Sequence, residues 1–304
     1  MKASTAFAPG SIGNVGPGFD VLGLAVDGIG DTVSVELTRG ESRVTAVTGR
    51  DAELVPRDAT RNCAAIAANA YLRPFGFRAI VTVEKGLALA GGMGGSAASS
   101  VAGAYAAALA LGQGPVIADV LAAALEGESA VAGRHLDNIA PSTLGGLALS
   151  RSTDPIDVVR LPVNAPWWIA MVTPAVRVQT KDARALLPES CDTATWIQQM
   201  ANTTALAHAL ASGDGELLRR SLDDRYAEPH RAALIPRFTE VKRAALEAGA
   251  LGCTISGSGP TIFAIGVDEA GARRCAEAMR AAFGSIDSAL HVGGIAQEGV
   301  RAVR

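Results

Sequence analysis

The sequence has few cysteines, few lysines and no run of basic residues, and these shortages exclude several classes of protein. Its 27 lysines and arginines stand against 30 acidic residues, which gives a formal net charge of −3 at pH 7. Without a basic patch, neither nucleic acid nor an anionic membrane is expected as a partner. The cysteines have neither the paired spacing of zinc ligands nor that of a disulfide framework, and stand at Cys63, Cys191, Cys253 and Cys275. We therefore expect reduced, buried thiols in a cytoplasmic protein, since the N-terminal segment also lacks the apolar core of a signal peptide.

The stretch Gly86–Ala118 contains no charged residue, but its composition is wrong for a membrane span. A span is dominated by Leu, Ile, Val and Phe, whereas this stretch is mostly Gly, Ala and Ser. The preceding residues, Arg78–Lys85, alternate as a strand should. Four glycines between positions 91 and 95 then predict a loop, and the composition favours a helix from Ser96 onward.

A strand, a glycine loop and a helix N-terminus together indicate an anion-binding site. The free N–H groups of the first helical turn and the helix dipole both favour negative charge. The stretch has neither the G-x-x-x-x-G-K-[ST] pattern of a P-loop nor the G-x-G-x-x-G pattern of a dinucleotide fold. Taken alone, the pattern also fits plain tight packing.

At 304 residues and 49% hydrophobic content the chain can bury a large core in two domains. The Gly- and Pro-rich segment Pro9–Gly28 is predicted to be a long functional loop. The next two alternating segments, Asp31–Thr38 and Ser42–Gly49, are predicted to form an antiparallel pair. Ala130–Gly146 is expected to be irregular. Strands with helices on one side indicate the α+β class.

Three segments resemble the three motifs of the GHMP kinase family in order and spacing: PGSIGNVGPGFDVLGLA, GGMGGSAASS and TISGSGP. Two further stretches resemble the homoserine kinase branch of that family. One is GRHLDNIAPSTLGG, and the other is the pair of arginine segments TKDARALLP and EPHRAALIP. The resemblance covers almost the whole chain.

The resemblance implies an N-terminal domain of the ribosomal protein S5 domain 2-like type, residues 1–163, and a ferredoxin-like C-terminal domain, residues 164–304. It implies transfer of the γ-phosphate of ATP, with Mg²⁺, to the side-chain hydroxyl of L-homoserine, a step of threonine biosynthesis. Two alternatives stay open: a GHMP kinase with a mevalonate-type acceptor, and a GHMP-fold sensor that binds ligands without turnover. A homodimer is also expected, with Trp196 in the core or in the subunit interface.

By resemblance, the glycine loop and its helix hold the ATP triphosphate. The implied nucleotide-binding residues are Gly91, Gly92, Met93, Gly94, Gly95, Ser96, Ala97, Ser99 and Asn62. Gly95 stands where the family usually has a serine, and Asn62 would also serve as a plain helix N-cap. Glu128, a catalytic residue here, would bind Mg²⁺ together with Ser96. Glu126 is its rival for that role.

The implied substrate-binding residues are Asn14, Asp20, His135, Asn138, Thr180, Arg184, Arg231 and Gly257. Asp20 would pair with the ammonium group of the amino acid, and the two arginines would hold its carboxylate, because a guanidinium fork matches a carboxylate. Asn138, the second implied catalytic residue, stands where sister kinases have an aspartate base, so it would orient the hydroxyl instead. Asp137 is a further candidate for the base, but a structural role in bracing the loop is favoured for it. The hydroxyl of Thr180 would serve equally well as a helix N-cap.

Overall fold

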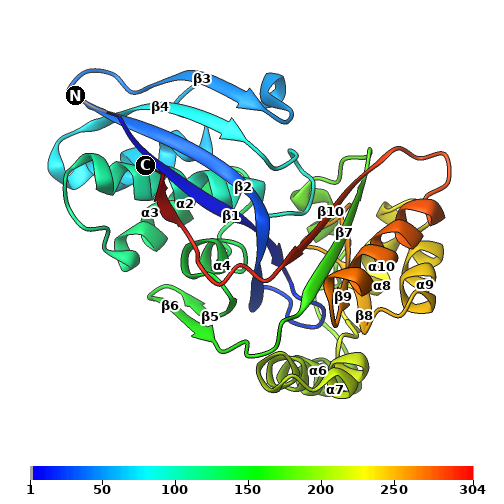
Figure 1. Cartoon of the computed structure of the whole chain (residues 1–304). Coiled ribbons are helices and arrows are strands. Elements are labelled where there is room, and N and C mark those ends of the chain that lie inside the picture. Colours follow the sequence, from blue (N-terminus) through cyan, green and yellow to red (C-terminus); the bar gives the residue numbers. More distant parts are fainter. Residues whose placement is uncertain (1–2, 304) are drawn as a thin grey trace.

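The computed structural model describes residues 3–303, and within them the strands form two sheets (Figure 1). In the first sheet the strands lie in the order β11-β1-β2-β4-β3, with β5 added to β2 and β6 added to β5. Neighbouring strands are antiparallel except for the parallel pair β3 and β4. Its strands are β1 (Ser4–Gly13), β2 (Leu22–Thr38), β3 (Arg43–Gly49), β4 (Arg78–Lys85), β5 (Leu147–Thr153), β6 (Ile156–Leu161) and β11 (Arg301–Val303).

Three helices rich in small residues pack beside this sheet. One of them, α2, contacts β1 and β2, and the three helices also pack against one another. Two glycines allow the close approach, since a Cβ on Gly103 would lie 2.5 Å from the carbonyl oxygen of Ala64, and one on Gly127 would lie 2.6 Å from that of Cys63. The helices are α1 (Cys63–Leu72), α2 (Gly95–Ala110) and α3 (Ile117–Ser129), with the short α4 (Ile139–Leu144) beside them.

The second sheet has the order β10-β7-β9-β8, and its strands β7, β9 and β8 are largely buried while the edge strand β10 is half-buried. Its strands are β7 (Trp168–Pro174), β8 (Gly252–Ile255), β9 (Ile262–Gly266) and β10 (Ser288–Gly294). Two amphipathic helices, α9 (Phe238–Glu247) and α10 (Glu269–Ala282), cover one face. The alternate residues of β9, Phe263 and Ile265, join the core of the first sheet, so one apolar interior runs from one sheet to the other.

The remaining helices lie between β7 and α9 in the chain. The pair α6 and α7 is seen at the bottom of Figure 1, and each begins at an aspartate that caps it. Their bounds are α5 (Thr180–Ala185), α6 (Thr193–Ser212), α7 (Gly215–Ser221) and α8 (Glu228–Arg231). Short 3-10 turns complete the set, η1 (Ala52–Leu54), η2 (Arg73–Phe75) and η3 (Ala232–Leu234).

Two sequence predictions about the first sheet are wrong. The strand β3 pairs with β4 rather than with β2, because β2 is already paired on one side by β1 and on the other by β4. The expected loop Pro9–Gly28 contains only residues 14–21, since β1 runs to Gly13 and β2 begins at Leu22. Gly23 lies inside β2, and only glycine fits at this position because a Cβ there would overlap the carbonyl oxygen of Asp137.

Three smaller expectations also need correction. The segment predicted to be irregular contains α4, and the final strand β11 was not predicted. Of the four free thiols, Cys253 and Cys275 are buried as expected, whereas Cys63 is half-buried and Cys191 is exposed. Because β11 pairs with β1, the end of the chain returns to the first sheet (Figure 1).

The division of the chain into two domains at residue 163 stays a prediction. Across residues 3–303, none of the helices has the length and apolar character that crossing a bilayer demands.

Candidate active site

A cavity of about 520 Å³ opens where the N-terminal end of α2 faces the second sheet. It is lined from the first side by the glycine loop, by the end of α3 and by residues 135–138. From the second side it is lined by α5, by Arg231 and by Gly257. Every one of the predicted substrate-binding residues lies on its wall.

The glycine loop is fixed by hydrogen bonds to its carbonyl groups. Gly91 accepts from the backbone N–H and the hydroxyl of Thr261, and Gly92 accepts from the Ser256 hydroxyl at 2.6 Å. The carbonyl oxygen of Met93 accepts from the N–H of Ser11 at 3.1 Å. Because the carbonyls are bound to the protein, the loop and the first turn of α2 present N–H groups to the cavity, as anion binding requires.

The predicted nucleotide residues are not equally placed. The cavity is lined by Gly91, Gly92, Gly94, Gly95, Ser96, Ser99 and Asn62. Met93 and Ala97 do not line it, and their side chains are buried in the core, so only their backbone remains for this role. Asn62 caps α1 by accepting from Ala65 N at 3.1 Å, which is the simpler of its two predicted roles. The nucleotide assignments themselves stay predictions.

A buried ion pair beneath the loop was missed at the sequence level. The ammonium group of Lys85, the last residue of β4, contacts the carboxylate of Asp31 and donates to Gly95 O at 3.0 Å. Ser99 donates to the same carboxylate at 2.6 Å, so its hydroxyl is already used. Asp31 also accepts from the N–H groups of Gly86 and Leu87. This cluster ties the first residue of α2 to the end of β4. Both strands carry other charged residues as well, so no local pattern marked this pair in the sequence.

Glu128, near the end of α3, lies in the cavity wall with 6% of its surface exposed. Its Oε2 atom has no hydrogen-bond partner among the described residues. Burial raises the pKa of this carboxyl group from 4.5 to about 7, against the lowering effect of the Ser96 hydroxyl. Its rival, Glu126, forms a surface ion pair with Arg73 at 2.7 Å and does not line the cavity.

The residues at this point fit a divalent cation. Glu128 lines the cavity and has one oxygen without a hydrogen-bond partner among the described residues, and such a carboxylate is a ligand that Mg²⁺ accepts, together with phosphate oxygens and water. Residues 3–303 contain no group of three or more His, Cys, Asp or Glu side chains placed to hold a metal. Phosphate oxygens would therefore have to complete the coordination.

At the other end of the cavity, Asp20 lies beside two arginines. The guanidinium of Arg184 donates to both carboxylate oxygens of Asp20, at 2.7 and 3.0 Å. Arg231 is 2% exposed and donates to the carbonyls of Ala183 and Gly257, at 3.3 and 3.2 Å. Both guanidinium groups lie 5.2 Å from the ring centre of Phe19, which forms a platform that the sequence did not indicate.

The loop of residues 14–21 is shaped by two residues in the left-handed conformation, Asn14 with φ 52° and Asp20 with φ 56°. The Asn14 side chain accepts from Asp20 N at 2.7 Å, which locks the loop. Asn14 N in turn donates to the buried carboxylate of Asp137 at 3.1 Å. Burial and the neighbouring charge of Asp20 raise the pKa of Asp137 to about 7. Asp137 thus braces the loop and also faces the cavity.

Three further predicted residues are placed as follows. Asn138 accepts from the Ser11 hydroxyl at 2.9 Å through its side-chain oxygen, which leaves its NH₂ group free to donate. His135 lies 3.6 Å from Asp20, and burial lowers its pKa, which favours the neutral ring. The N-cap of α5 is Gln179, so the alternative of Thr180 as a cap is wrong. The Thr180 hydroxyl is 3.3 Å from that of Ser258, in the cavity wall.

Replacing Gly95 with serine should be tolerated, with an unchanged or lower KM for ATP. A Cβ at this helical position would lie 3.4 Å or more from its neighbours, an ordinary contact. Gly94 is the matched contrast, because its φ is +66° and a Cβ would meet the Ser11 hydroxyl and Asn138. Gly94→Ala should therefore raise the KM for ATP roughly tenfold or more. Equal effects of the two substitutions in a steady-state assay would contradict this view of the loop.

Comparisons with known proteins agree with this arrangement. The family model for the GHMP kinase N-terminal domain matches residues 60–146, and that for the C-terminal domain matches residues 206–285. The chain is 40% identical to a homoserine kinase of Chlorobium phaeobacteroides over 95% of each chain. It is 44% identical to a homoserine kinase of Pyrococcus abyssi over 86% of each chain.

A solved structure gives the same result. The crystal structure of homoserine kinase from Cytophaga hutchinsonii superposes with a TM-score of 0.93 and is 42% identical, with 100% of this chain and 98% of that chain covered. The α+β fold that the sequence predicted is thereby confirmed. The chain belongs to the homoserine kinases of the GHMP kinase family.

Proposed function

We infer that the chain is an ATP-dependent kinase that transfers the γ-phosphate to the side-chain hydroxyl of L-homoserine. Relatives named as homoserine kinases match nearly all of the chain. The observation that carries the inference is the content of one cavity. It joins an anion-binding helix start, an acidic oxygen with no protein partner, and an aspartate beside two arginines.

The polyphosphate is assigned to the N–H groups at the start of α2. Glu128 and Ser96 would hold Mg²⁺ there, and the bound ion would neutralise charge on the phosphate oxygens. The transfer forms a bond from the substrate hydroxyl oxygen to the γ-phosphorus and breaks the bond from that phosphorus to the β–γ bridging oxygen. Such a reaction needs positioning and charge neutralisation more than covalent help from the protein.

The other end of the cavity is assigned to the amino acid. Asp20 offers a carboxylate to the ammonium group, and Arg184 and Arg231 offer guanidinium groups to the carboxylate. The free NH₂ of Asn138 would donate to the hydroxyl and orient it. The hydroxyl proton passes to an oxygen of the transferred γ-phosphoryl group, or to Asp137, whose pKa of about 7 suits a proton acceptor near neutral pH.

A coupled assay of ADP release over homoserine, serine, mevalonate, shikimate and galactose tests this function. Homoserine should be the preferred acceptor. Binding of ATP and homoserine without any ADP release would instead indicate a sensor, and preference for mevalonate would indicate the other enzyme.

Asp20→Asn should raise the KM for homoserine roughly tenfold or more, because a charge-assisted contact to the ammonium group is lost. Turnover of 4-hydroxybutanoate, which has the same hydroxyl and carboxylate but no amine, is the internal control and should not change. If turnover of both acceptors fell to the same extent, Asp20 would be holding the loop in place rather than contacting the ammonium group.

A homodimer is also part of the proposal. On α6 the side chains of Trp196, Ile197 and Met200 are exposed, which suits an interface. Light scattering after gel filtration would report the mass. The expected cytoplasmic location remains a prediction.

A further inference from the structure

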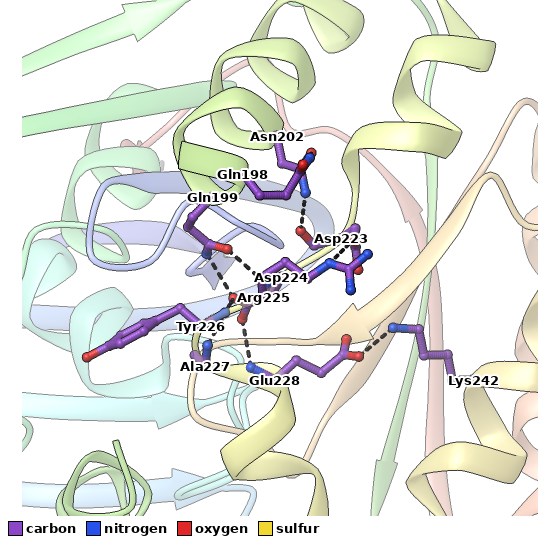
Figure 2. Close-up of polar contacts among 10 residues, drawn as sticks. All are labelled: Gln198, Gln199, Asn202, Asp223, Asp224, Arg225, Tyr226, Ala227, Glu228 and Lys242. Atoms are coloured by element: carbon purple, nitrogen blue, oxygen red, sulfur yellow. Dashed lines mark hydrogen bonds and ion pairs between the residues drawn. The ribbon is translucent and has the colours of Figure 1, made fainter. Parts of the chain in front are cut away.

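A network of hydrogen bonds behind the cavity joins α6, the loop of residues 14–21 and α8. Its centre is Asp224, which is 7% exposed and touches none of the groups assigned to ATP or homoserine. Figure 2 shows its carboxylate between Gln199 of α6 and the backbone that leads into α8. The function proposed above does not use these residues.

Asp224 holds the start of α8. Its Oδ1 accepts from the N–H groups of Tyr226 and Ala227, and its Oδ2 accepts from that of Glu228, each at 2.9 Å. A carboxylate that accepts several N–H groups fixes a helix start strongly. Arg231 is the last residue of this short helix. By holding the start of the helix, Asp224 therefore fixes the position of the Arg231 backbone, from which the side chain extends to the cavity.

Gln199 connects this helix start to the substrate loop. Its amide nitrogen donates to Asp224 Oδ1 at 2.8 Å and also to the carbonyl oxygen of Pro17 at 2.9 Å. Its amide oxygen accepts from Arg225 N at 2.8 Å. One side chain therefore spans the loop that presents Asp20 and the helix that presents Arg231.

Two other contacts hold the same frame. Glu228 pairs with Lys242 of α9 (Figure 2) and accepts from Thr254 of β8, which fixes α8 to the second sheet. Tyr226 packs edge-on against Phe19, with ring centres 5.3 Å apart, and Phe19 lies under both arginines. The contacts of Gln199 and Asp224 thus lead, through the loop of residues 14–21 and through α8, to the site assigned to the amino acid and not to the glycine loop.

We propose that Gln199 and Asp224 are positioning residues that set the spacing between Asp20 and Arg231, and with it the fit of a substrate that carries both an ammonium and a carboxylate group. The proposal rests on the assignment of these two residues to homoserine. It predicts that substitutions at these two residues change the KM for homoserine independently of the KM for ATP.

The experiment compares Gln199→Ala with Gln198→Ala, the same change one residue earlier on α6. The Gln198 amide donates to Asn202, which itself donates to Asp223 O, but among the described residues it has no hydrogen bond to Asp224 or to the loop of residues 14–21. Gln199→Ala should raise the KM for homoserine roughly tenfold. Its KM for ATP and its thermal midpoint should match those of Gln198→Ala. Gln199→Glu keeps the acceptor for Arg225 N but loses both donors, so it should not restore the KM.

Asp224→Asn should raise the same KM further, because an NH₂ group would then face donors at the start of α8. The proposal is overturned if Gln199→Ala has the homoserine KM of Gln198→Ala, or if its KM values for homoserine and ATP rise in equal proportion. Arg231→Ala distinguishes a failure of the substrate-site assignment from a failure of the positioning role proposed for Gln199 and Asp224. If it leaves the homoserine KM unchanged, the assignment of Arg231 to the substrate fails, whereas an effect of Arg231→Ala without one of Gln199→Ala rejects only the positioning role of Gln199 and Asp224.

Discussion

Glu128→Gln should lower kcat roughly a hundredfold or more while the protein remains at least as stable as before. The substitution keeps the shape of the side chain but removes the charge that a divalent cation needs. The loss should be visible as a higher Mg²⁺ requirement in steady-state turnover at pH 8. Glu126→Gln, two residues earlier on the surface of α3, is the matched control and should keep normal activity.

The stability of this variant separates a metal ligand from a structural residue. The pKa of Glu128 is about 7 in the folded protein, above its ordinary 4.5, so ionising it costs stability. The cost is absent below pH 4.5 and complete above about pH 7, where it amounts to about 3 kcal/mol. Glu128→Gln should therefore raise the unfolding free energy at pH 8, with a difference that shrinks as the pH falls. A lower thermal midpoint at pH 8, or unchanged Mg²⁺-dependent turnover, would count against the assignment.

Arg231→Ala should raise the KM for homoserine by up to roughly a hundredfold, the value of a charge-assisted pair in a buried site. Arg231→Lys should recover only part of the loss, because a lysine keeps the charge but its compact ammonium group lacks the planar fork by which the guanidinium reaches separate acceptors. Arg184→Ala should have a smaller effect, since the Arg184 side chain is 38% exposed and so more strongly screened.

The control for these arginines is Arg243→Ala on α9, where the side chain is 70% exposed and pairs only with Glu247 at 3.9 Å. Its KM values should be those of the unaltered protein. A normal homoserine KM in both Arg231→Ala and Arg184→Ala would move the carboxylate site to another part of the cavity.

Local features of the fold were predictable because they depend on neighbouring residues. The strand Arg78–Lys85 has the predicted bounds, and Asn62 caps α1 as its position indicated. Strand pairing was less predictable. The alternation of β3 identifies a strand but does not say which edge receives it, and β2 has both of its edges occupied. The three residues of β11 are too few for any periodicity.

The same contrast between local patterns and contacts of distant segments holds for the candidate site. The residues that face the cavity could be named because the motifs carry them. Their supporting partners could not, since Lys85 and Asp31 are 54 positions apart and Gln199 and Asp224 are 25 apart. Arg184 and Asp20 were each predicted as a contact to the substrate, but their direct pairing over 164 positions was not. Such contacts depend on how distant segments meet, which no local pattern encodes.

The pairing of β1 with β11 has a consequence for synthesis. Thr5, Ala6 and Phe7 lie opposite Val303, Ala302 and Arg301, and the Arg301 guanidinium lies 4.4 Å from the ring centre of Phe7. A nascent chain therefore carries an open strand edge on β1 until residues 301–303 have been synthesised. Because such an edge recruits other chains, a product that lacks β11 should be prone to aggregate even with every residue of the cavity in place.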